Sequence, residues 1–454
     1  MKKTFILLLT LCFVIGSVNV SWATEKELSL VGQSAILIDA NTGKVLYEKN
    51  SRKQHYPAST TKIMTAILTL ENLELSDPVT IDSETSFTEG SRIYLLEGEK
   101  VTVKEVLYGL LLESANDSAV ALAKEISGTV EEFAKLMNQK AVKLGAKNTH
   151  FVNPNGLHED DHLTTAYDLA MIAKYAMKNK TFRDFVSTYQ YTMPATNLQE
   201  TRYFYNTNRL LYDDLHSVPV NGVNRPCKYK GVTGIKTGYT GKAGGCLVAS
   251  AKRGNTELIA VTLASTDMGR FADCITLLDY GFENYKTIST LACGQELGTI
   301  PVKRGAVRKV PISVSEDACA TLPLEASEKL IRTEVDLYKN LKAPVEIGQK
   351  AGVVKVFMGD QLLGEYDAIA TKTIKKGGFL SLFGIPESAS KIVEKIIFYT
   401  FCILLLLSFL YIIIKRRQIK KKKLLRQHQR EKLRRLNDRD KARWQEEYWN
   451  TRQY

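Results

Sequence analysis

Cysteine is scarce in this chain of 454 residues, which contains only seven. They stand far apart, at Cys12, Cys227, Cys246, Cys274, Cys293, Cys319 and Cys402. A small secreted domain held together by disulfides would need a dense, even-numbered set at short spacings. The scattered pattern therefore excludes a disulfide framework, and we expect at most one or two bridges. The sequence also contains no internal repeat.

Net charge is absent from most of the chain, although the whole sequence carries +13. Residues 415–454 contain 16 lysines and arginines against 5 acidic residues, and Lys2 and Lys3 add two more positive charges. These two ends account for the whole excess, so residues 24–414 are neutral overall. A nucleic-acid-binding surface would need a basic patch in the folded part. We therefore expect no nucleic-acid partner.

The two ends of the chain read as targeting and membrane segments. A basic start, an apolar run and the small-x-small site Ser21-Trp22-Ala23 predict a signal peptide over 1–23. Residues 396–414 are nineteen residues without a charge, which is long enough to span a bilayer as a transmembrane helix. Basic residues begin at Lys415, and such residues stay on the cytoplasmic side. The sequence predicts a single-pass cell-membrane protein with an exported main part and a basic cytoplasmic tail over 415–454.

Between these ends, strand-like and helix-like segments alternate. Hairpins are predicted around Asn41-Thr42-Gly43 and Arg253-Gly254-Asn255, with helical periodicity dominating between them. This pattern predicts an α+β domain over 28–288, built as an antiparallel sheet with an inserted helical cluster. Short alternating runs over 291–372 predict a small all-β domain, and 373–395 reads as a linker.

The pentapeptide His158-Glu159-Asp160-Asp161-His162 matches the H-E-x-x-H signature of zinc proteases. That signature requires both histidines on one face of a helix. Here turn-forming residues precede the motif, two aspartates stand within it, and a helix start signal comes only at Thr165. We therefore predict a polar loop without a metal, and a zinc site is the minor alternative.

The first motif that points to chemistry is Ser59-Thr60-Thr61-Lys62. Pro57 precedes it and apolar residues at helical spacing follow, so Ser59 would stand at the start of a buried helix. Lys62 lies one turn further on the same face, where its amine would reach the hydroxyl and act as its base. Alone the motif is weak, because a serine cap followed by a surface lysine is commoner.

Two further motifs follow in order. Ser114-Ala115-Asn116 stands where an apolar run gives way to polar residues, so its serine could relay a proton and its asparagine could hold a substrate amide. Lys236-Thr237-Gly238 lies between strand-like segments. Its first two side chains offer donors for a carboxylate, and the glycine lets the backbone approach a ligand. Alone, the second motif is a loop between helices and the third is a common tripeptide.

Together the motifs S-x-x-K, S-x-N and K-T-G form the set shared by class A β-lactamases and penicillin-binding proteins. Over about 28–372 the sequence resembles the low-molecular-weight penicillin-binding proteins, the serine-type D-alanyl-D-alanine carboxypeptidases of the peptidase S11 type. The resemblance implies a β-lactamase/transpeptidase-like catalytic domain without a cofactor. It also implies removal of the terminal D-alanine from peptidoglycan stem peptides through an acyl-serine intermediate, and binding of β-lactam antibiotics.

The resemblance implies catalytic roles for the positions that match. Ser59 would attack the carbonyl between the two D-alanines, and Lys62 would be its base. Lys236, a second cation nearby, would help to lower the pKa of Lys62. Ser114 would pass the proton to the leaving D-alanine.

It implies binding roles as well. Asn116 would bind the peptide, and Thr237 and Arg270 would hold the terminal carboxylate beside Lys236 and Gly238. The backbone N–H groups of Ser59 and Tyr239 would form the oxyanion hole. His162 would line the cleft without a metal.

Some features separate this sequence from related families. S-A-N replaces S-D-N, and no Glu-x-x-Leu-Asn follows it, so the deacylating glutamate of class A β-lactamases is missing. Many relatives carry an amphipathic C-terminal helix in the membrane surface, whereas here a spanning helix with a basic tail is predicted. Carboxypeptidase is the leading prediction. The alternatives are a D,D-endopeptidase acting on cross-links, a β-lactamase, a zinc peptidase and a non-catalytic wall-binding protein.

Overall fold

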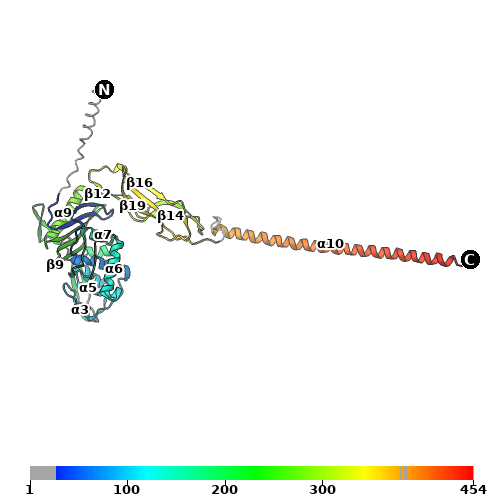
Figure 1. Cartoon of the computed structure of the whole chain (residues 1–454), viewed down its shortest axis with the longest axis horizontal. Coiled ribbons are helices and arrows are strands. Elements are labelled where there is room, and N and C mark those ends of the chain that lie inside the picture. The colour runs from blue at the N-terminus through cyan, green and yellow to red at the C-terminus, as the bar shows by residue number, and fades with distance from the viewer. Residues whose placement is uncertain (1–26, 379–380, 382–386, 453–454) are drawn as a thin grey trace, which may run out of the picture. The chain divides into compact units, whose positions relative to one another are not determined.

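The computed structural model describes residues 27–378, 381 and 387–452 (Figure 1). The predicted signal peptide lies outside the described residues, as does part of the predicted linker. The chain divides into two compact units. One comprises Met1–Cys293, Glu316–Glu334 and Val354–Tyr366, and the other comprises Gly294–Ser315, Val335–Val353 and Asp367–Tyr454. The domain limits expected from the sequence cut the chain at other residues and stay a prediction.

A five-stranded antiparallel sheet in the order β2-β1-β11-β10-β9 forms the centre of the first unit. Its strands are β1 (Ser34–Asp39), β2 (Val45–Lys49), β9 (Val232–Thr240), β10 (Gly244–Arg253) and β11 (Thr256–Ser265). Both predicted hairpins are present, because β1 pairs with β2 and β10 pairs with β11 in antiparallel register. The third motif lies on β9, at the edge of this sheet.

Each face of the sheet has its own apolar core, because successive side chains of a strand point to opposite sides. Ile36 and Ile38 of β1 join the helical cluster, whereas Ala35 and Leu37 pack with α9 (Gly269–Asn284) on the other face. Figure 1 shows α5, α6 and α7 gathered on one side of the sheet. The cluster comprises α2 (Lys62–Asn72), α4 (Val103–Leu111), α5 (Asn116–Ser127), α6 (Val130–Lys143), α7 (Ala166–Ala176) and α8 (Lys180–Ser187).

Short elements connect the helices and strands of this unit. They are η1 (Ala58–Thr61), β3 (Pro78–Val79), α3 (Ser83–Ser86), β4 (Val101–Thr102), β5 (Gln190–Met193), β6 (Arg202–Tyr205), η2 (Arg209–Leu211), β7 (Ser217–Val220) and β8 (Val223–Pro226). The single turn of 3-10 helix, η1, runs directly into α2. The predicted start of α7 is confirmed, since the Thr165 hydroxyl accepts a hydrogen bond from the Asp168 backbone N–H.

The region after α9 is built from strands, as the sequence predicted. β12 (Tyr285–Leu291) pairs with β15 (Ala318–Pro323). A six-stranded sheet has the order β16-β18-β19-β14-β13-β17. Its strands are β13 (Glu296–Lys303), β14 (Lys309–Val314), β16 (Ile331–Leu337), β17 (Leu341–Lys342), β18 (Lys350–Met358) and β19 (Gln361–Ala370), with a short η3 (Glu328–Leu330) before β16.

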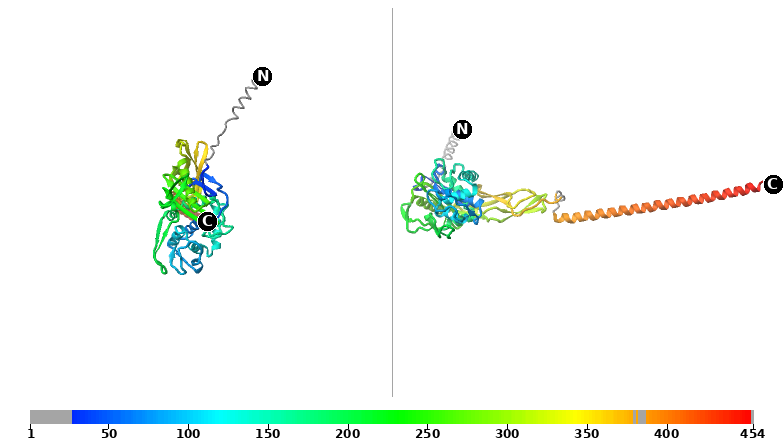
Figure 2. Two further views of the ribbon diagram at one scale, coloured as in Figure 1. Left: turned by 90° about the vertical axis from the view of Figure 1, so that its left-hand side faces the viewer. Right: turned by 90° about the horizontal axis from the view of Figure 1, so that it is seen from below.

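One long helix, α10 (Glu387–Asn450), lies at the C-terminal end of the described chain, and the right-hand view of Figure 2 shows it as one continuous helix. It contains the uncharged segment 396–414, and its most apolar window has a mean hydropathy of 2.7 with none of its residues buried. An exposed apolar helix of this length fits a membrane anchor. The basic residues after Lys415 continue the same helix up to Asn450.

Four cysteines between residues 27 and 378 are buried free thiols. They are Cys227, Cys246, Cys274 and Cys319. The fold of the described residues is therefore held by its two cores and its sheets rather than by disulfides.

Candidate active site

The structure brings the three motifs together at the edge of the central sheet. Ser59 stands on η1 and Lys62 is the first residue of α2. Asn116 is the first residue of α5, and Lys236 lies on β9. The Lys62 ammonium nitrogen, Nζ, is 3.0 Å from Ser59 Oγ and 2.7 Å from Asn116 Oδ1. Segments far apart in the sequence thus meet around one amine.

Ser59 is the half-buried member of a buried group. Lys62, Lys236 and Asn116 expose at most 4% of their surfaces, whereas Ser59 is partly open to solvent. Gly238 of β9 lies directly against η1, since a Cβ added there would be 3.0 Å from Pro57 O and 3.1 Å from Ser59 N. A larger residue would push the strand away from the serine, so this close approach requires glycine.

The surroundings of Lys62 favour its neutral form. Its Nζ also lies 2.6 Å from the backbone oxygen of Asn155, so two carbonyl oxygens, Asn155 O and Asn116 Oδ1, accept from it. Burial lowers the pKa of Lys62 well below its usual value, and the positive charge of Lys236 lowers it further. A neutral amine has two N–H donors and one lone pair. The two carbonyls take the donors, which leaves the lone pair for the Ser59 hydroxyl to donate to.

Asn116 is oriented by backbone contacts on both sides. Its Nδ2 donates to Glu89 O at 2.7 Å, and its own backbone N–H donates to Ser91 O at 2.7 Å. These bonds point Oδ1 towards Lys62. Next to it, Ser114 has a backbone φ of +60° and is 8% exposed. Residues held in this sparsely populated region cluster at functional sites.

The third motif supplies a cation and a hydroxyl, and Arg270 of α9 adds a second cation beside it. Lys236 Nζ donates to Thr237 O at 3.1 Å, and burial together with the neighbouring Arg270 lowers the pKa of Lys236 to about 7. Thr237 Oγ1 lies 2.6 Å from Thr207 Oγ1. Arg270 Nη1 donates to Gly238 O at 2.8 Å, while its Nη2 pairs with Asp267 at 2.7 Å. Arg270 is therefore fixed against β9 at the motif itself.

Comparison with known proteins decides the family. The family model described as D-alanyl-D-alanine carboxypeptidase matches residues 21–267, and that of the penicillin-binding protein 5 C-terminal domain matches residues 285–376. The chain belongs to the D-alanyl-D-alanine carboxypeptidase family. The predicted fold class is confirmed with it, as is the prediction of a serine D-alanyl-D-alanine carboxypeptidase.

Individual relatives support the same assignment. The D-alanyl-D-alanine carboxypeptidase DacF of Bacillus subtilis is 38% identical over 361 residues, which is 78% of this chain and 89% of the relative. DacA of Escherichia coli K12 is 32% identical over 360 residues, 76% of this chain and 84% of the relative. The crystal structure of penicillin-binding protein 5 from Haemophilus influenzae matches with a TM-score of 0.58 and 28% identity, covering 78% of this chain and all of that chain.

In this carboxypeptidase the H-E-x-x-H pentapeptide lies in a loop, as predicted, and the described residues contain no group of three or more metal-binding side chains. His162 is 1% exposed, so it does not line an open cleft as we expected. Its Nδ1 accepts from the Val152 N–H at 3.0 Å, and its Nε2 is 2.8 Å from Thr61 Oγ1. Burial lowers the pKa of His162 to about 3. The neutral ring therefore contacts η1 on its buried side, through Thr61.

Sequence reasoning missed Asn155, Gly156 and Thr207. Asn155 and Gly156 belong to an Asn-Pro-Asn-Gly run that we interpreted only as turn-forming. Gly156 has a φ of +84°, and a Cβ there would be 2.0 Å from Ala58 O. This glycine thus lets the Asn155 carbonyl reach Lys62. No local signal in the sequence pointed to Thr207.

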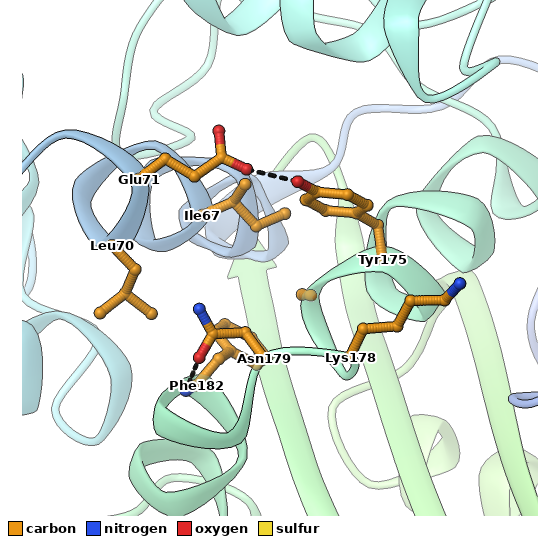
Figure 3. Close-up of a pocket in the computed structure, with 8 residues that line it drawn as sticks. Ile67, Leu70, Glu71, Tyr175, Lys178, Asn179 and Phe182 are labelled. Atoms are coloured by element: carbon orange, nitrogen blue, oxygen red, sulfur yellow. Dashed lines mark hydrogen bonds between the residues drawn. The ribbon is translucent and has the colours of Figure 1, made fainter. Parts of the chain in front are cut away.

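A separate cavity of about 260 Å³ lies further along α2, between that helix and α7 and α8 (Figure 3). Ile67, Leu70 and Phe182 supply its apolar lining, and Figure 3 shows Tyr175 donating to Glu71 at one side. None of the predicted site residues lines it. This cavity is therefore separate from the group of residues formed by the three motifs.

Proposed function

We propose that Ser59 is the nucleophile of this carboxypeptidase and that Lys62 is its general base. The single observation that carries the proposal is the hydrogen-bonding arrangement of Lys62. Two carbonyl oxygens accept from its Nζ, and Ser59 Oγ lies 3.0 Å from the same nitrogen, so in the neutral amine the lone pair is left for the Ser59 hydroxyl. A nucleophilic serine needs an adjacent base of this kind.

The reaction then proceeds in two steps. Ser59 Oγ attacks the carbonyl carbon between the two D-alanines and its proton passes to Lys62. The backbone N–H groups of Ser59 and Tyr239 stabilise the oxyanion. The C–N bond breaks as Ser114 delivers a proton to the leaving D-alanine and is reprotonated by Lys62, which returns to its neutral form. Water next attacks the acyl-serine ester, and the shortened peptide leaves with a carboxylate while Ser59 regains its proton.

The remaining residues hold the substrate. We assign the terminal carboxylate to Thr237 and Arg270, whose side chains lie at β9 around Gly238. Lys236 keeps positive charge near the carboxylate and lowers the pKa of Lys62. The Nδ2 group of Asn116 has a second N–H, beyond the one donated to Glu89, that is available for the peptide.

We also propose the membrane topology. The family acts on peptidoglycan peptides ending in D-Ala-D-Ala, which lie outside the cytoplasm, so the main part must be exported. After cleavage of 1–23, the apolar part of α10 over 396–414 would span the membrane once. The positive charges that begin at Lys415 would keep the tail on the cytoplasmic side.

Intact mass of the full-length chain after incubation with benzylpenicillin tests the serine assignment. We expect one covalent adduct in the wild type and none in Ser59→Ala. Ser118→Ala is the matched control, because Ser118 is a fully buried serine whose Oγ has no hydrogen-bond partner among the described residues. An adduct in folded Ser59→Ala would overturn the assignment. Release of D-alanine from a D-Ala-D-Ala peptide by the same variants tests turnover.

A further inference from the structure

Positive charge is concentrated at one place in the strand region after α9. Residues 291–372 contain 11 lysines and arginines and 11 acidic residues, so the region is neutral overall. Five of those cations nevertheless line a single cavity of about 600 Å³: Lys303, Arg304, Arg308, Lys309 and Lys339. The other lining residues among those described are uncharged, so none of the described carboxylates lines the cavity.

The backbone fixes this arrangement. Lys303 ends β13 and Lys309 begins β14, so the turn between two paired strands presents four of the five cations. Lys339 comes from the segment before β17, which pairs in parallel with β13. The Val302 N–H donates to Arg308 O at 2.8 Å and the Ala343 N–H donates to Lys303 O at 3.0 Å. Like charges held together repel one another unless an anion lies between them.

The same turn is tied to the start of the predicted membrane helix. The Gly377 N–H donates to Arg304 O at 3.0 Å, and the Glu387 N–H, at the first residue of α10, donates to Ala306 O at 2.9 Å. Ser381 also lines the cavity. The basic turn therefore lies beside the point where the chain enters α10.

Helix geometry sets how far this turn lies from the bilayer. Ile396, the first residue of the uncharged segment, is nine positions after Glu387, which is about 14 Å at a rise of about 1.5 Å per residue. The polar headgroup layer on each side of the hydrocarbon core is about 5–8 Å thick. Long lysine and arginine side chains extend towards such a layer. The cations of the turn can therefore reach phosphate groups at the membrane surface.

We propose that this cavity binds the phosphate of anionic phospholipid headgroups in the leaflet from which α10 emerges. The proposal rests on the membrane span proposed above and does not involve the catalytic site. The recognised chemistry is a phosphate ester, and its source is the lipid surface rather than free phosphate. A basic group next to a membrane helix is attracted to anionic lipid in this way.

Hydrogen exchange of the full-length chain in lipid nanodiscs tests the proposal. We expect backbone amides over 303–309 to exchange at least about fivefold more slowly in discs that contain phosphatidylglycerol than in discs of pure phosphatidylcholine. This factor is the one expected for one or more basic side chains that bind an anionic surface. High salt should abolish the difference. Equal exchange in the two kinds of disc would overturn the proposal. Slowing by inorganic phosphate in neutral discs to the same extent would overturn the lipid as the source.

Charge-matched variants locate the effect. Arg304→Gln/Lys309→Gln/Lys339→Gln should lose the lipid-dependent slowing, whereas Lys252→Gln/Lys329→Gln/Lys372→Gln removes the same charge away from the cavity and should keep it. Acylation by benzylpenicillin should be unchanged in both, which checks folding independently. If both variants lost the lipid-dependent slowing equally, the total charge of the protein, and not the cavity, would be responsible. That result would overturn the proposal. The wild-type comparison between discs remains decisive if a variant fails to fold.

Discussion

Replacing Gly156 by alanine should impair acylation at Ser59, the nucleophile that we propose, with little damage elsewhere. The new Cβ would lie 2.0 Å from Ala58 O and 2.9 Å from Thr61 Oγ1, against an ordinary contact of 3.4 Å or more. The first of these pairs must therefore separate by about 1.4 Å. Ala58 precedes Ser59, and Asn155 precedes Gly156 and accepts from Lys62, so the clash shifts the start of η1 and the Asn155 carbonyl that orients Lys62.

The expected losses of stability and of acylation rate have two separate causes. Alanine at a φ of +84° costs about 1–2 kcal/mol of stability. A displacement of about 1 Å at a reacting group costs about 100-fold in rate. We therefore expect the acylation rate constant for a fluorescent penicillin, measured by stopped flow, to fall at least about 100-fold in Gly156→Ala.

A second glycine separates strain from displacement. Gly145 has a φ of +81°, and a Cβ added there would meet nothing within 4 Å. Gly145→Ala should thus lose similar stability from backbone strain while acylating within about twofold of the wild type. Wild-type acylation by a folded Gly156→Ala would refute the reasoning, because the clash would then have been absorbed without moving the site. Equal loss of rate in both variants would assign the effect to strain alone.

Three further predictions concern charge. The acylation rate should rise with pH as Lys62 loses its proton. Lys236→Gln should move that rise to higher pH, because Lys236 lowers the pKa of Lys62. The same pH–rate profile in the variant and the wild type would contradict this. His162 has a folded pKa of about 3, below its usual 6.5, so the unfolded state binds the proton first and the free energy of unfolding falls as pH drops below 6.5. In urea titrations at pH 6.5 and 4.5, His162→Gln should remove about 2 kcal/mol of this loss. An equal loss of stability in the wild type and the variant would exclude His162 as the cause. Arg270→Gln should lower kcat/KM about 10-fold or more for a peptide with a free terminal carboxylate but much less for the C-terminal amide, and equal losses on both peptides would remove Arg270 from carboxylate binding.

The elements that could be predicted from the sequence are those specified by local chemistry. Asn41-Thr42-Gly43 and Arg253-Gly254-Asn255 form hairpin turns in the structure, and Thr165 caps α7. These signals depend on residues a few positions apart. The order of the five strands, in which β1 from the N-terminus lies between β2 and β11, depends on contacts across more than two hundred residues. No periodicity within a segment reports such pairings.

The contacts of the candidate site also divide into local ones, which the sequence predicts, and long-range ones, which it does not. Serine and lysine three positions apart on a helical turn must lie close together, so Ser59 and Lys62 could be paired from the sequence. The carbonyl of Asn155 reaches Lys62 from 93 positions away, and any residue type could have supplied that backbone oxygen. Its only trace in the sequence is Gly156, whose missing side chain makes room for the approach. A glycine inside a run of turn formers does not reveal which neighbour it accommodates.

The two buried lysines differ in their hydrogen-bond partners, and these partners, rather than burial, distinguish their roles at this site. Burial lowers the pKa of both Lys62 and Lys236, and each amine is nearly inaccessible. Lys62 has two carbonyl acceptors and a hydroxyl around it, so its neutral form can take the proton of that hydroxyl. Lys236 makes one hydrogen bond among the described residues, to Thr237 O, and so retains donors for a substrate anion. A bound carboxylate would raise the pKa of Lys236 and keep it charged, and that charge in turn favours the neutral state of Lys62. Substrate binding would thereby reinforce the state of the base that the first step requires.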